Sequence, residues 1–500
     1  MDPLTAISLA SSVVQFVDFS TKLVSSAHSL YLSTSGAKAE HLELEDLARS
    51  LQQQADEATP QNISNNAALS KQDQTLVSLG NSCRAVADEL LSALDKLKLK
   101  GGSFRGLKSI YIALKGVLEE EKIASIQQRL DRVGKIMNSQ IIFNLQSRML
   151  EILDRLETKN RSLESTRERD IIDLKEDIKR QFEQIKEGQE LQEGAVSRAL
   201  DQLTISMKKS KEYSAEQRIL GALRYDDMNY RRVTLRSAHD KTFSWMFSST
   251  ATTNGDHFPS KFEDWLTSND TVFWISGRIG SGKSTLMKYI CDHEFVRSNL
   301  KKWSEGNRLV ITNFFFWNAS KNDLPKTKEG LMRSILYQIL RQAPDLIQYV
   351  TPGEWENFVS SDLGCDELGL NFLTTPELLA TFERITAMLA TTKIKLVFFI
   401  DGLDEYDGKP EDIIPLIISL KKASTYIKMC VSSRRWNQFE TEFGQDNSRK
   451  LYIEAFTKKD IELYVRETLG RDSGYQGMME DEDSPIDLVQ EIVSEYFQSK

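Results

Sequence analysis

Cysteine is scarce in this sequence. The 500 residues contain four cysteines, Cys83, Cys291, Cys365 and Cys430, and no two of them form a CxxC pair. This spacing excludes a disulfide framework and a cysteine-based zinc site. Isolated thiols are typical of a reducing compartment, so we expect a cytoplasmic protein.

The sequence also lacks a leader and a long apolar run. It opens MDPLTAISLASSVVQFVDF, with an acid at position 2 and no basic segment, which is a poor signal peptide. No stretch approaches about 18 uninterrupted apolar residues, so we predict no transmembrane helix. None of the five histidines stands in a Ser–His–Asp or Cys–His arrangement. The net charge of −9 argues against a protein dedicated to nucleic acid.

Glycine and proline are nearly absent between residues 119 and 215, where Glu, Lys, Gln and Arg dominate. Apolar residues recur at heptad-like spacing in this region: Ile126, Leu130, Val133 and Met137, then Leu145, Met149, Ile152 and Leu156, and in part Ile178, Phe182 and Ile185. This spacing predicts long helices, either a helical hairpin or a coiled coil. The repeat breaks near residues 157–170, so one unbroken rod is not expected.

Residues 1–118 have the three-to-four-residue apolar spacing of helices, and we predict a helical, effector-like N-terminal domain there. Its amphipathic first helix is expected to pack into a core. A basic cluster surrounds Gly101. We favour a solvated loop for this cluster over contact with an anionic membrane surface.

The pattern of apolar residues changes after a linker at 216–250. Short β-branched and aromatic runs then alternate with helical patterns: TVFWIS, RLVITNFFFW, KLVFFID, IKMCVSS and KLYIEAF. Such runs are typical of buried parallel strands joined by crossover helices. We therefore predict an α/β domain over 251–456. The start of a further helical domain follows at 457–500, with Thr457 as its N-cap and Asp460 three residues on.

The segment GRIGSGKS at 277–284 has the pattern of a phosphate-binding loop, G-x-x-x-x-G-K-[ST]. Gly277, Gly280 and Gly282 would let the backbone curl so that its N–H groups, including those at Ser281, face phosphate oxygens. The helix that starts near Lys283 would direct its positive N-terminus at the same anion.

The side chains that follow these glycines have separate expected roles. Lys283 can reach the β- and γ-phosphates. The hydroxyl of Ser284 is placed for Mg²⁺, and Thr285 for the α-phosphate.

A second motif, KLVFFIDGLDEYDG, ends an apolar run in an acid. Asp401 at the tip of that strand can hold Mg²⁺ opposite Ser284. Asp404 and Glu405 are candidates for orienting or deprotonating an attacking water, with Asp404 slightly favoured.

A third motif, IKMCVSSRRW, places two arginines after a buried strand. Arg434 or Arg435 would lie at the edge where α/β sheets bind ligands, and could sense or stabilise phosphate charge.

Together, GRIGSGKST, FFIDGLDE and CVSSRR resemble the NACHT domain, a branch of the signal-transducing ATPases with numerous domains. LRYDDMNYRRVTLRSAHDKTFSWMF and the opening residues resemble the fungal NACHT and nephrocystin-like group more narrowly. The resemblance implies a sheet of order 5-1-4-3-2, with Arg434 as the sensor arginine, although Arg435 replaces the proline that usually follows.

The resemblance also implies a nucleotide-driven signalling switch. Such proteins bind ATP or GTP with Mg²⁺, hydrolyse it slowly and self-associate with triphosphate, and their N-terminal domains contact protein partners. The family normally continues into winged-helix and repeat regions, which we expect to be missing after SPIDLVQEIVSEYFQSK. The alternatives are a P-loop enzyme of another type, such as a kinase or motor, and a nucleotide-binding scaffold without turnover.

Overall fold

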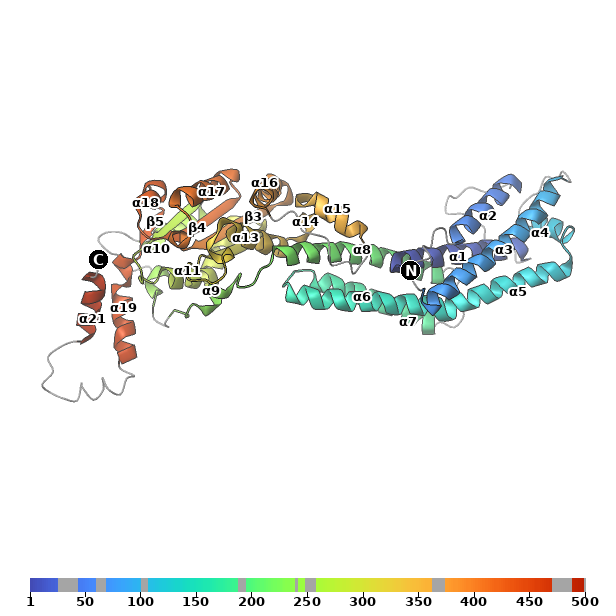
Figure 1. Cartoon of the computed structure of the whole chain (residues 1–500), viewed down its shortest axis with the longest axis horizontal. Helices are drawn as coiled ribbons and strands as arrows, with labels where there is room; N and C mark the ends of the chain where they lie inside the picture. Colours follow the sequence, from blue (N-terminus) through green and yellow to red (C-terminus); the bar gives the residue numbers. More distant parts are fainter. Residues whose placement is uncertain are drawn as a thin grey trace. The chain divides into compact units, whose positions relative to one another are not determined.

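The structure is a computed structural model. It describes residues 1–25, 44–59, 69–99, 107–187, 195–238, 242–247, 258–361, 374–469 and 488–498 (Figure 1). The chain divides into two compact units. Unit 1 contains Met1–Ala215 and a short segment that begins at Phe358, and unit 2 contains the rest. The predicted boundaries at 118, 250 and 456 stay predictions.

Unit 1 is helical in all its described parts. Its helices are α1 (Pro3–Val24), α2 (Leu44–Ala58), α3 (Lys71–Leu99), α4 (Leu107–Lys115), α5 (Glu120–Ile136), a π turn η1 (Met137–Ile141), α6 (Ile142–Ser162) and α7 (Glu168–Glu187). The next helix, α8 (Ala195–Leu223), begins in unit 1, and its residues from Glu216 onward belong to unit 2. One hydrophobic core joins α1, α2 and α3 to α5, α6 and α7. The core therefore continues across residue 118, because both sets of helices bury their apolar faces against each other.

Helix α1 is a central member of this core. Asp2 caps its N-terminus by accepting hydrogen bonds from the backbone N–H groups of Leu4 and Thr5. By length and composition alone, α1 could cross a membrane, although polar residues interrupt its apolar positions. In this structure ten of its residues, including Phe16 and Leu23, are buried within unit 1. The apolar stripe of α1 is thus occupied by packing.

The long helix of unit 1 contains a local change of pitch. All eight residues of the two predicted heptad runs in α5 and α6 are buried. The first run ends at Met137 and the second begins at Leu145, one residue later than a strict repeat would place it. The π turn lies between them, and its last hydrogen bond joins the N–H of Ile142 to the carbonyl of Met137. A π turn holds one extra residue, so both runs stay on the same face.

A buried ion cluster joins three helices of unit 1. Asp73 of α3 is 4% exposed and lies 3.0 Å from Nη1 of Arg148 and 3.1 Å from the amino group of Met1. Burial alone would raise the pKa of Asp73, but hydrogen bonds from the Met1 amino group and Ser70, with the charge of Arg148, lower it below its usual value. Because its partners surround it, this carboxylate can stay charged inside the protein.

Unit 2 alternates strands and helices, as predicted. Its strands are β1 (Val272–Ser276), β2 (Arg308–Phe315), β3 (Ile394–Asp401), β4 (Ile427–Ser433) and β5 (Lys450–Tyr452). Its helices are α9 (Tyr230–Thr234), α10 (Phe258–Thr267), α11 (Lys283–Asp292), α12 (Glu294–Ser304), α13 (Lys328–Gln342), α14 (Ile347–Val350), α15 (Pro352–Ser360), α16 (Thr375–Thr392), α17 (Pro410–Ala423), α18 (Asn437–Phe443), α19 (Glu454–Leu469) and α21 (Leu488–Gln498). Short 3₁₀ turns lie at Ser244–Phe247, Leu324–Lys326, Pro344–Leu346 and Leu403–Glu405.

The five strands form one sheet of order β2-β3-β4-β1-β5, and all pairs are parallel. Read from β5, this is 5-1-4-3-2, the order that the family resemblance implied. Strand β4 lies between the strands that end at Ser276 and Asp401. The carboxyl ends of parallel strands meet at one edge, so the three motifs are brought to the same edge.

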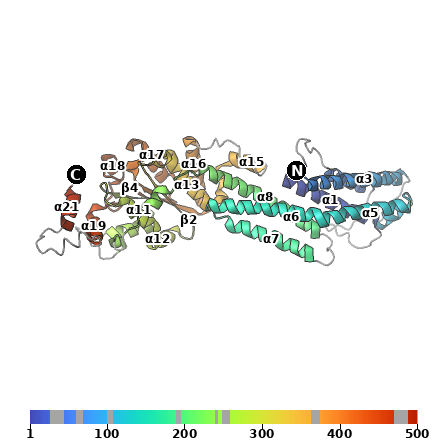
Figure 2. The same ribbon diagram turned by 60° about the horizontal axis from the view of Figure 1, so that its bottom comes forward.

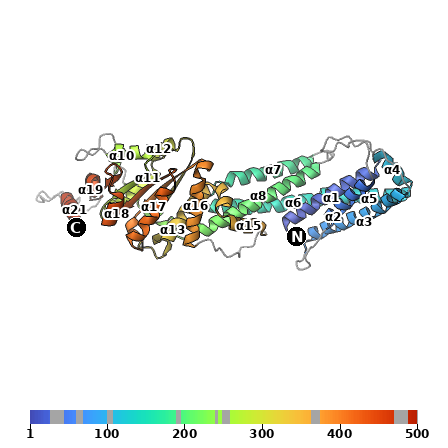
Figure 3. The same ribbon diagram turned by 90° about the horizontal axis from the view of Figure 1, so that it is seen from above.

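Helices cover both faces of the sheet (Figure 3). Helices α10, α11 and α12 lie on one side, where Phe273, Val397 and Phe399 join their core cluster. Helices α13, α16, α17 and α18 lie on the other side. There Phe382 of α16 packs against Phe398. Successive strand residues point to opposite faces, which explains why β3 is buried at all eight positions.

The edge strand β2 is covered by polar side chains of α13 (Figure 2 shows both elements). Oε1 of Gln338 accepts a hydrogen bond from Asn313 N, and its Nε2 donates to Asn313 O. Gln342 donates to Ile311 O. These contacts satisfy main-chain groups that have no neighbouring strand.

The start of α19 corrects one prediction. The helix begins at Glu454, so Thr457 lies inside its first turn and is not the N-cap. The hydroxyl of Thr457 donates to the carbonyl of Ile453. Asp460 is turned toward the preceding linker and accepts hydrogen bonds from Phe243 N and Trp245 Nε1. These two contacts span 217 and 215 positions of sequence, which local capping rules cannot show.

Candidate nucleotide-binding site

The loop between β1 and α11 has the curled backbone that its glycines predict. Gly280 and Gly282 have φ angles of 75° and 87°, and Gly282 is the N-cap of α11. Side chains with a Cβ rarely adopt this left-handed region, so glycine is required there. The first turn of α11 then opens with Lys283, Ser284 and Thr285, as the sequence predicts. Its free N–H groups give this end of the helix a positive potential.

Close packing explains the first glycine of the loop. A Cβ at Gly277 would lie 2.3 Å from Cγ2 of Ile453 and 2.6 Å from Oγ of Ser281. Ser281 is buried and donates to the carbonyl of Arg278. The N–H of Arg278 donates to Oε1 of Glu454 at 2.6 Å. The loop is therefore held in place by Ile453 and Glu454, at the junction of β5 and α19.

Lys283 is folded over the loop. Its Nζ donates to the carbonyls of Gly277 at 2.7 Å and Arg278 at 2.8 Å. Burial lowers the pKa of Lys283, while the carboxylates of Asp404 and Asp401 partly oppose that effect. The ammonium group thus lies in the phosphate loop, within the field of Asp401 and Asp404, two of the three acids that the sequence singled out.

Asp401 ends β3 beneath this loop and is 1% exposed. Its Oδ1 accepts a hydrogen bond of 2.5 Å from the hydroxyl of Ser432 in β4. Burial raises the pKa of Asp401 to about 6, and interactions with the hydroxyls of Ser284 and Ser432 oppose the rise. Ser432 also accepts from the N–H of Gly402, which fixes the turn after the strand.

Asp401 fits the role of a Mg²⁺ ligand. Its Oδ2 is buried and has no hydrogen-bond partner among the described residues. A buried carboxylate oxygen without a partner is costly unless a cation or a proton accompanies it. Ser284 is the adjacent hydroxyl. Within the described ranges no group of three or more His, Cys, Asp or Glu residues could hold a metal ion.

Asp404 and Arg434 form an ion pair across this edge. Nε of Arg434 lies 2.7 Å from Oδ2 of Asp404, and the Arg434 N–H donates to Oδ1 at 2.9 Å. The Asp404 carboxylate is 4% exposed, so both of its oxygens are engaged. Arg435 instead pairs with Glu440 and lies over the ring of Tyr452, away from the loop. Of the two arginines, Arg434 is the one at the site.

Glu405 occupies a more open position. Its Oε2 accepts from the N–H of Asn318 at 3.2 Å, and its Oε1 lies 3.9 Å from Nη2 of Arg231. The Glu405 side chain is 26% exposed, several times more than that of Asp404. Sequence reasoning missed Arg231 as a site residue. The arginine pair in NYRRVTL was its only signal, because helix α9 lies outside the three motifs.

These groups converge on one cavity of about 300 Å³. Its lining includes residues 279–285, Gly402, Asp404, Glu405 and Arg434, together with Arg231 and Leu235 of the preceding linker. Gly277 and Asp401 are not among the lining residues. The structure thus brings together residues that are more than 150 positions apart in sequence.

The linker before the sheet also contacts the loop. The Phe243 ring lies 3.7 Å from the position that a Cβ on Gly282 would take. Asp460 of α19 accepts from Phe243 N at 3.0 Å and from Trp245 Nε1 at 2.8 Å. Trp245 stacks on Phe456. A short linker segment therefore contacts both the phosphate loop and α19.

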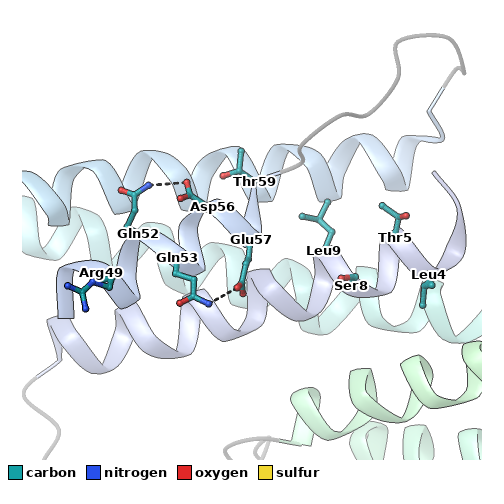
Figure 4. Close-up of a pocket in the computed structure, with 10 residues that line it drawn as sticks. All are labelled: Leu4, Thr5, Ser8, Leu9, Arg49, Gln52, Gln53, Asp56, Glu57 and Thr59. Carbon is teal, nitrogen blue, oxygen red and sulfur yellow. Dashed lines mark hydrogen bonds between the residues drawn. The ribbon is translucent and has the colours of Figure 1, made fainter. Parts of the chain in front are cut away.

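A second cavity, of about 800 Å³, lies between α1 and α2 in unit 1 (Figure 4). Its lining consists of Leu4, Thr5, Ser8, Leu9, Arg49, Gln52, Gln53, Asp56, Glu57 and Thr59. The amides of Gln52 and Gln53 donate to the carboxylates of Asp56 and Glu57 one turn later. These polar groups satisfy each other along α2, so this groove presents no converging catalytic set.

Comparisons with known proteins agree with the motifs. Residues 256–434 match the family model described as Nephrocystin 3, N-terminal. The chain is 26% identical over 185 residues to the vegetative incompatibility protein HET-E-1 of Podospora anserina. That match covers 36% of this chain and 12% of the relative, so the chain spans a small part of that protein. No solved structure matches.

Proposed function

We propose that this chain, which is similar to fungal NACHT and nephrocystin-like proteins, is a nucleotide-driven signalling switch. The observation that carries the proposal is the joint geometry of the loop and the two strand ends. A curled glycine loop at the N-terminus of α11 faces Asp401, whose Oδ2 has no partner among the described residues. Phosphate and Mg²⁺ supply the anion and the cation that these two features need.

Each residue has a role in this proposal. Loop N–H groups from Gly280 to Thr285 bind phosphate oxygens, and Lys283 adds a full positive charge once it leaves its loop carbonyls. Asp401 and Ser284 would hold Mg²⁺, which neutralises phosphate charge. ATP and GTP fit this chemistry equally, because the base-recognising residues are not identified.

Hydrolysis is proposed to be slow. Both oxygens of Asp404 are engaged by Arg434, and Glu405 is the more accessible of the two acids. An acid that must first leave an arginine cannot position water freely. A γ-phosphate would compete for Arg434 and release Asp404. If the Arg434–Asp404 pair stays closed, nucleotide would bind without being hydrolysed. A nucleotide-binding scaffold without turnover is therefore the second candidate.

The proposed output is self-association. A ligand shifts a conformational equilibrium only through its different affinity for two states. The exchange of Arg434 between Asp404 and phosphate supplies such a difference. Unit 1 would then contact other copies or protein partners, in the cytoplasm, where the free and buried Cys83, Cys291 and Cys430 remain reduced. The relative's name refers to vegetative incompatibility, and we propose signalling of that general kind.

Two measurements test this function. Purified chain is denatured and the released nucleotide is identified by chromatography, and bound ADP is the expected result. Light scattering then compares the mass with ADP and with a non-hydrolysable ATP analogue across a concentration series. We expect a larger mass with the analogue. Identical masses would exclude nucleotide-gated assembly and favour a nucleotide-binding scaffold.

A further inference from the structure

Unit 2 has a second polar cavity, of about 630 Å³, beside the edge strand β2. Helices α9, α12 and α13 all contact this strand (α12 and α13 are labelled in Figure 2). The lining consists of Arg232, Cys291, Arg297, Lys301, Ser304, Gly306, Asn307, Leu309, Ile311, Asn313, Gln338, Arg341 and Gln342. The volume lies in the range of small-molecule sites.

The charge of this lining is one-sided. Arg232, Arg297, Lys301 and Arg341 come from three helices, and none of the lining residues that the structure describes is acidic. Asp292 pairs with Nη2 of Arg232 and offsets one of the four charges. The whole chain carries a net charge of −9, so this surplus is local. Converging cations in a concave surface attract and concentrate anions.

The cavity contains donors that the protein itself does not use. Nε of Arg232 is buried and has no hydrogen-bond partner among the described residues. Arg297 and Lys301 stand one turn apart on the exposed face of α12, and no carboxylate within the described ranges pairs with either. An ordinary solvated helix face would present one row of charges. Here arginines from α9 and α13 line the same cavity as the basic residues of α12. Solvation of one helix face does not explain this convergence.

We propose that this cavity binds a small ligand that carries several phosphate groups. Arginine recognises phosphate by paired N–H donors, and lysine adds a point charge. Basic side chains from three helices around one space favour clustered phosphates over a single anion. Inositol polyphosphates and linear polyphosphates share this chemistry, and the test distinguishes them. The site does not depend on the proposed nucleotide function.

The test must separate the two cavities, because Arg231 of α9 lines the nucleotide cavity and Arg232 lines this one. Full-length chain with Lys283→Ala is therefore titrated calorimetrically with myo-inositol hexakisphosphate and, separately, with tripolyphosphate. We expect saturable binding of at least one probe with one site per chain. The probe that binds more tightly identifies the arrangement of phosphates.

A paired substitution locates the site. Arg297→Gln with Lys301→Gln should weaken binding at least about tenfold, the loss expected for charged hydrogen bonds. Lys421→Gln with Lys422→Gln removes the same charge from exposed positions on α17 and should leave the affinity unchanged. The single reversal Lys301→Glu gives a second variant at an exposed position. No saturable binding of either probe, or equal weakening by both paired variants, would overturn the proposal.

Discussion

Arg434 holds Asp404 by two contacts, one from its guanidinium Nε to Oδ2 and one from its own N–H to Oδ1. This is a relationship between a proposed phosphate sensor and a proposed catalytic acid. If, as proposed, a γ-phosphate draws the Arg434 guanidinium away, Asp404 becomes free to position water. The pair would then couple phosphate sensing to turnover.

The first prediction concerns the two acids of this turn. Asp404→Asn and Glu405→Gln should both slow hydrolysis, because a carboxylate that positions water acts mainly in the transition state. Neither variant should lose triphosphate affinity, and Asp404→Asn should gain some, because it frees Arg434 for phosphate. Single-turnover rates and calorimetry measure the two effects separately. Glu442→Gln, an exposed change on α18, is the control. Normal turnover in both variants with retained binding would show that neither acid is catalytic.

The second prediction concerns Lys283. Lys283→Ala should weaken triphosphate binding by roughly 2–5 kcal/mol, the usual loss when one partner of a poorly screened charge pair is removed. Monophosphate, which lacks the β- and γ-phosphates, should lose less. Calorimetry with both ligands gives the comparison, and Lys421→Ala is the matched control because that lysine is exposed on α17. Near-wild-type affinity for triphosphate would rule out the assigned role.

The third prediction follows from the raised pKa of Asp401, about 6 against the ordinary value of 3.8. The folded protein holds this proton more tightly than the unfolded chain, so the carboxyl stabilises the fold fully below about pH 4. That contribution is lost as the pH rises from about 4 to about 6, and amounts to about 3 kcal/mol. Asp401→Asn should therefore raise the melting temperature at pH 7.5 without Mg²⁺.

The comparison needs two further arms. The advantage of Asp401→Asn should shrink at pH 4.5, where the wild-type carboxyl is mostly protonated. Mg²⁺ with nucleotide should stabilise the wild type more than the variant, since a ligand stabilises only the state that binds it. Glu442→Gln should follow the wild type throughout. A variant less stable than the wild type at pH 7.5 without ligand would contradict the assignment of a cation-dependent carboxylate.

Much of the site could be predicted from sequence because its residues are contiguous within three short motifs. A glycine needed for positive φ, a lysine and a strand-ending acid leave local signatures, as at Gly282 and Asp401. Arg231 left no such signature, because its helix reaches the cavity only through tertiary packing. The engagement of Asp404 by Arg434 was likewise invisible, since residues 30 positions apart meet only across two strands.

The fold shows a similar limit. The spacing of apolar residues and the residue composition indicated the helices and the parallel sheet. They did not indicate that Lys428, inside the strand run IKMCVSS, would be completely buried and donate to three carbonyls, those of Trp265, Ser268 and Asp270. A lysine in a β pattern normally predicts an exposed position. The end of α10 and the turn before β1 supply the acceptors that make its burial tolerable.

The fourth prediction uses the π turn of unit 1. Deletion of the exposed Ser139 should convert the turn to regular α-helix and keep both heptad runs facing the core. We expect a melting temperature close to that of the wild type. Deletion of Arg155, equally exposed but inside regular α6, shifts every later apolar residue by about 100° and should destabilise unit 1 strongly. Equal destabilisation by both deletions would exclude a register-absorbing role for the turn.

The glutamines of α13 have a consequence for how copies of this chain can join. An uncovered edge strand can pair with strands of other copies, and such pairing can extend into a fibre. Gln338 and Gln342 occupy the main chain of β2, and the opposite edge, β5, is three residues long. Neither edge strand of the sheet favours the addition of strands from other copies. If copies of this chain self-associate as proposed, we expect them to join through helical surfaces and not along the edges of the sheet.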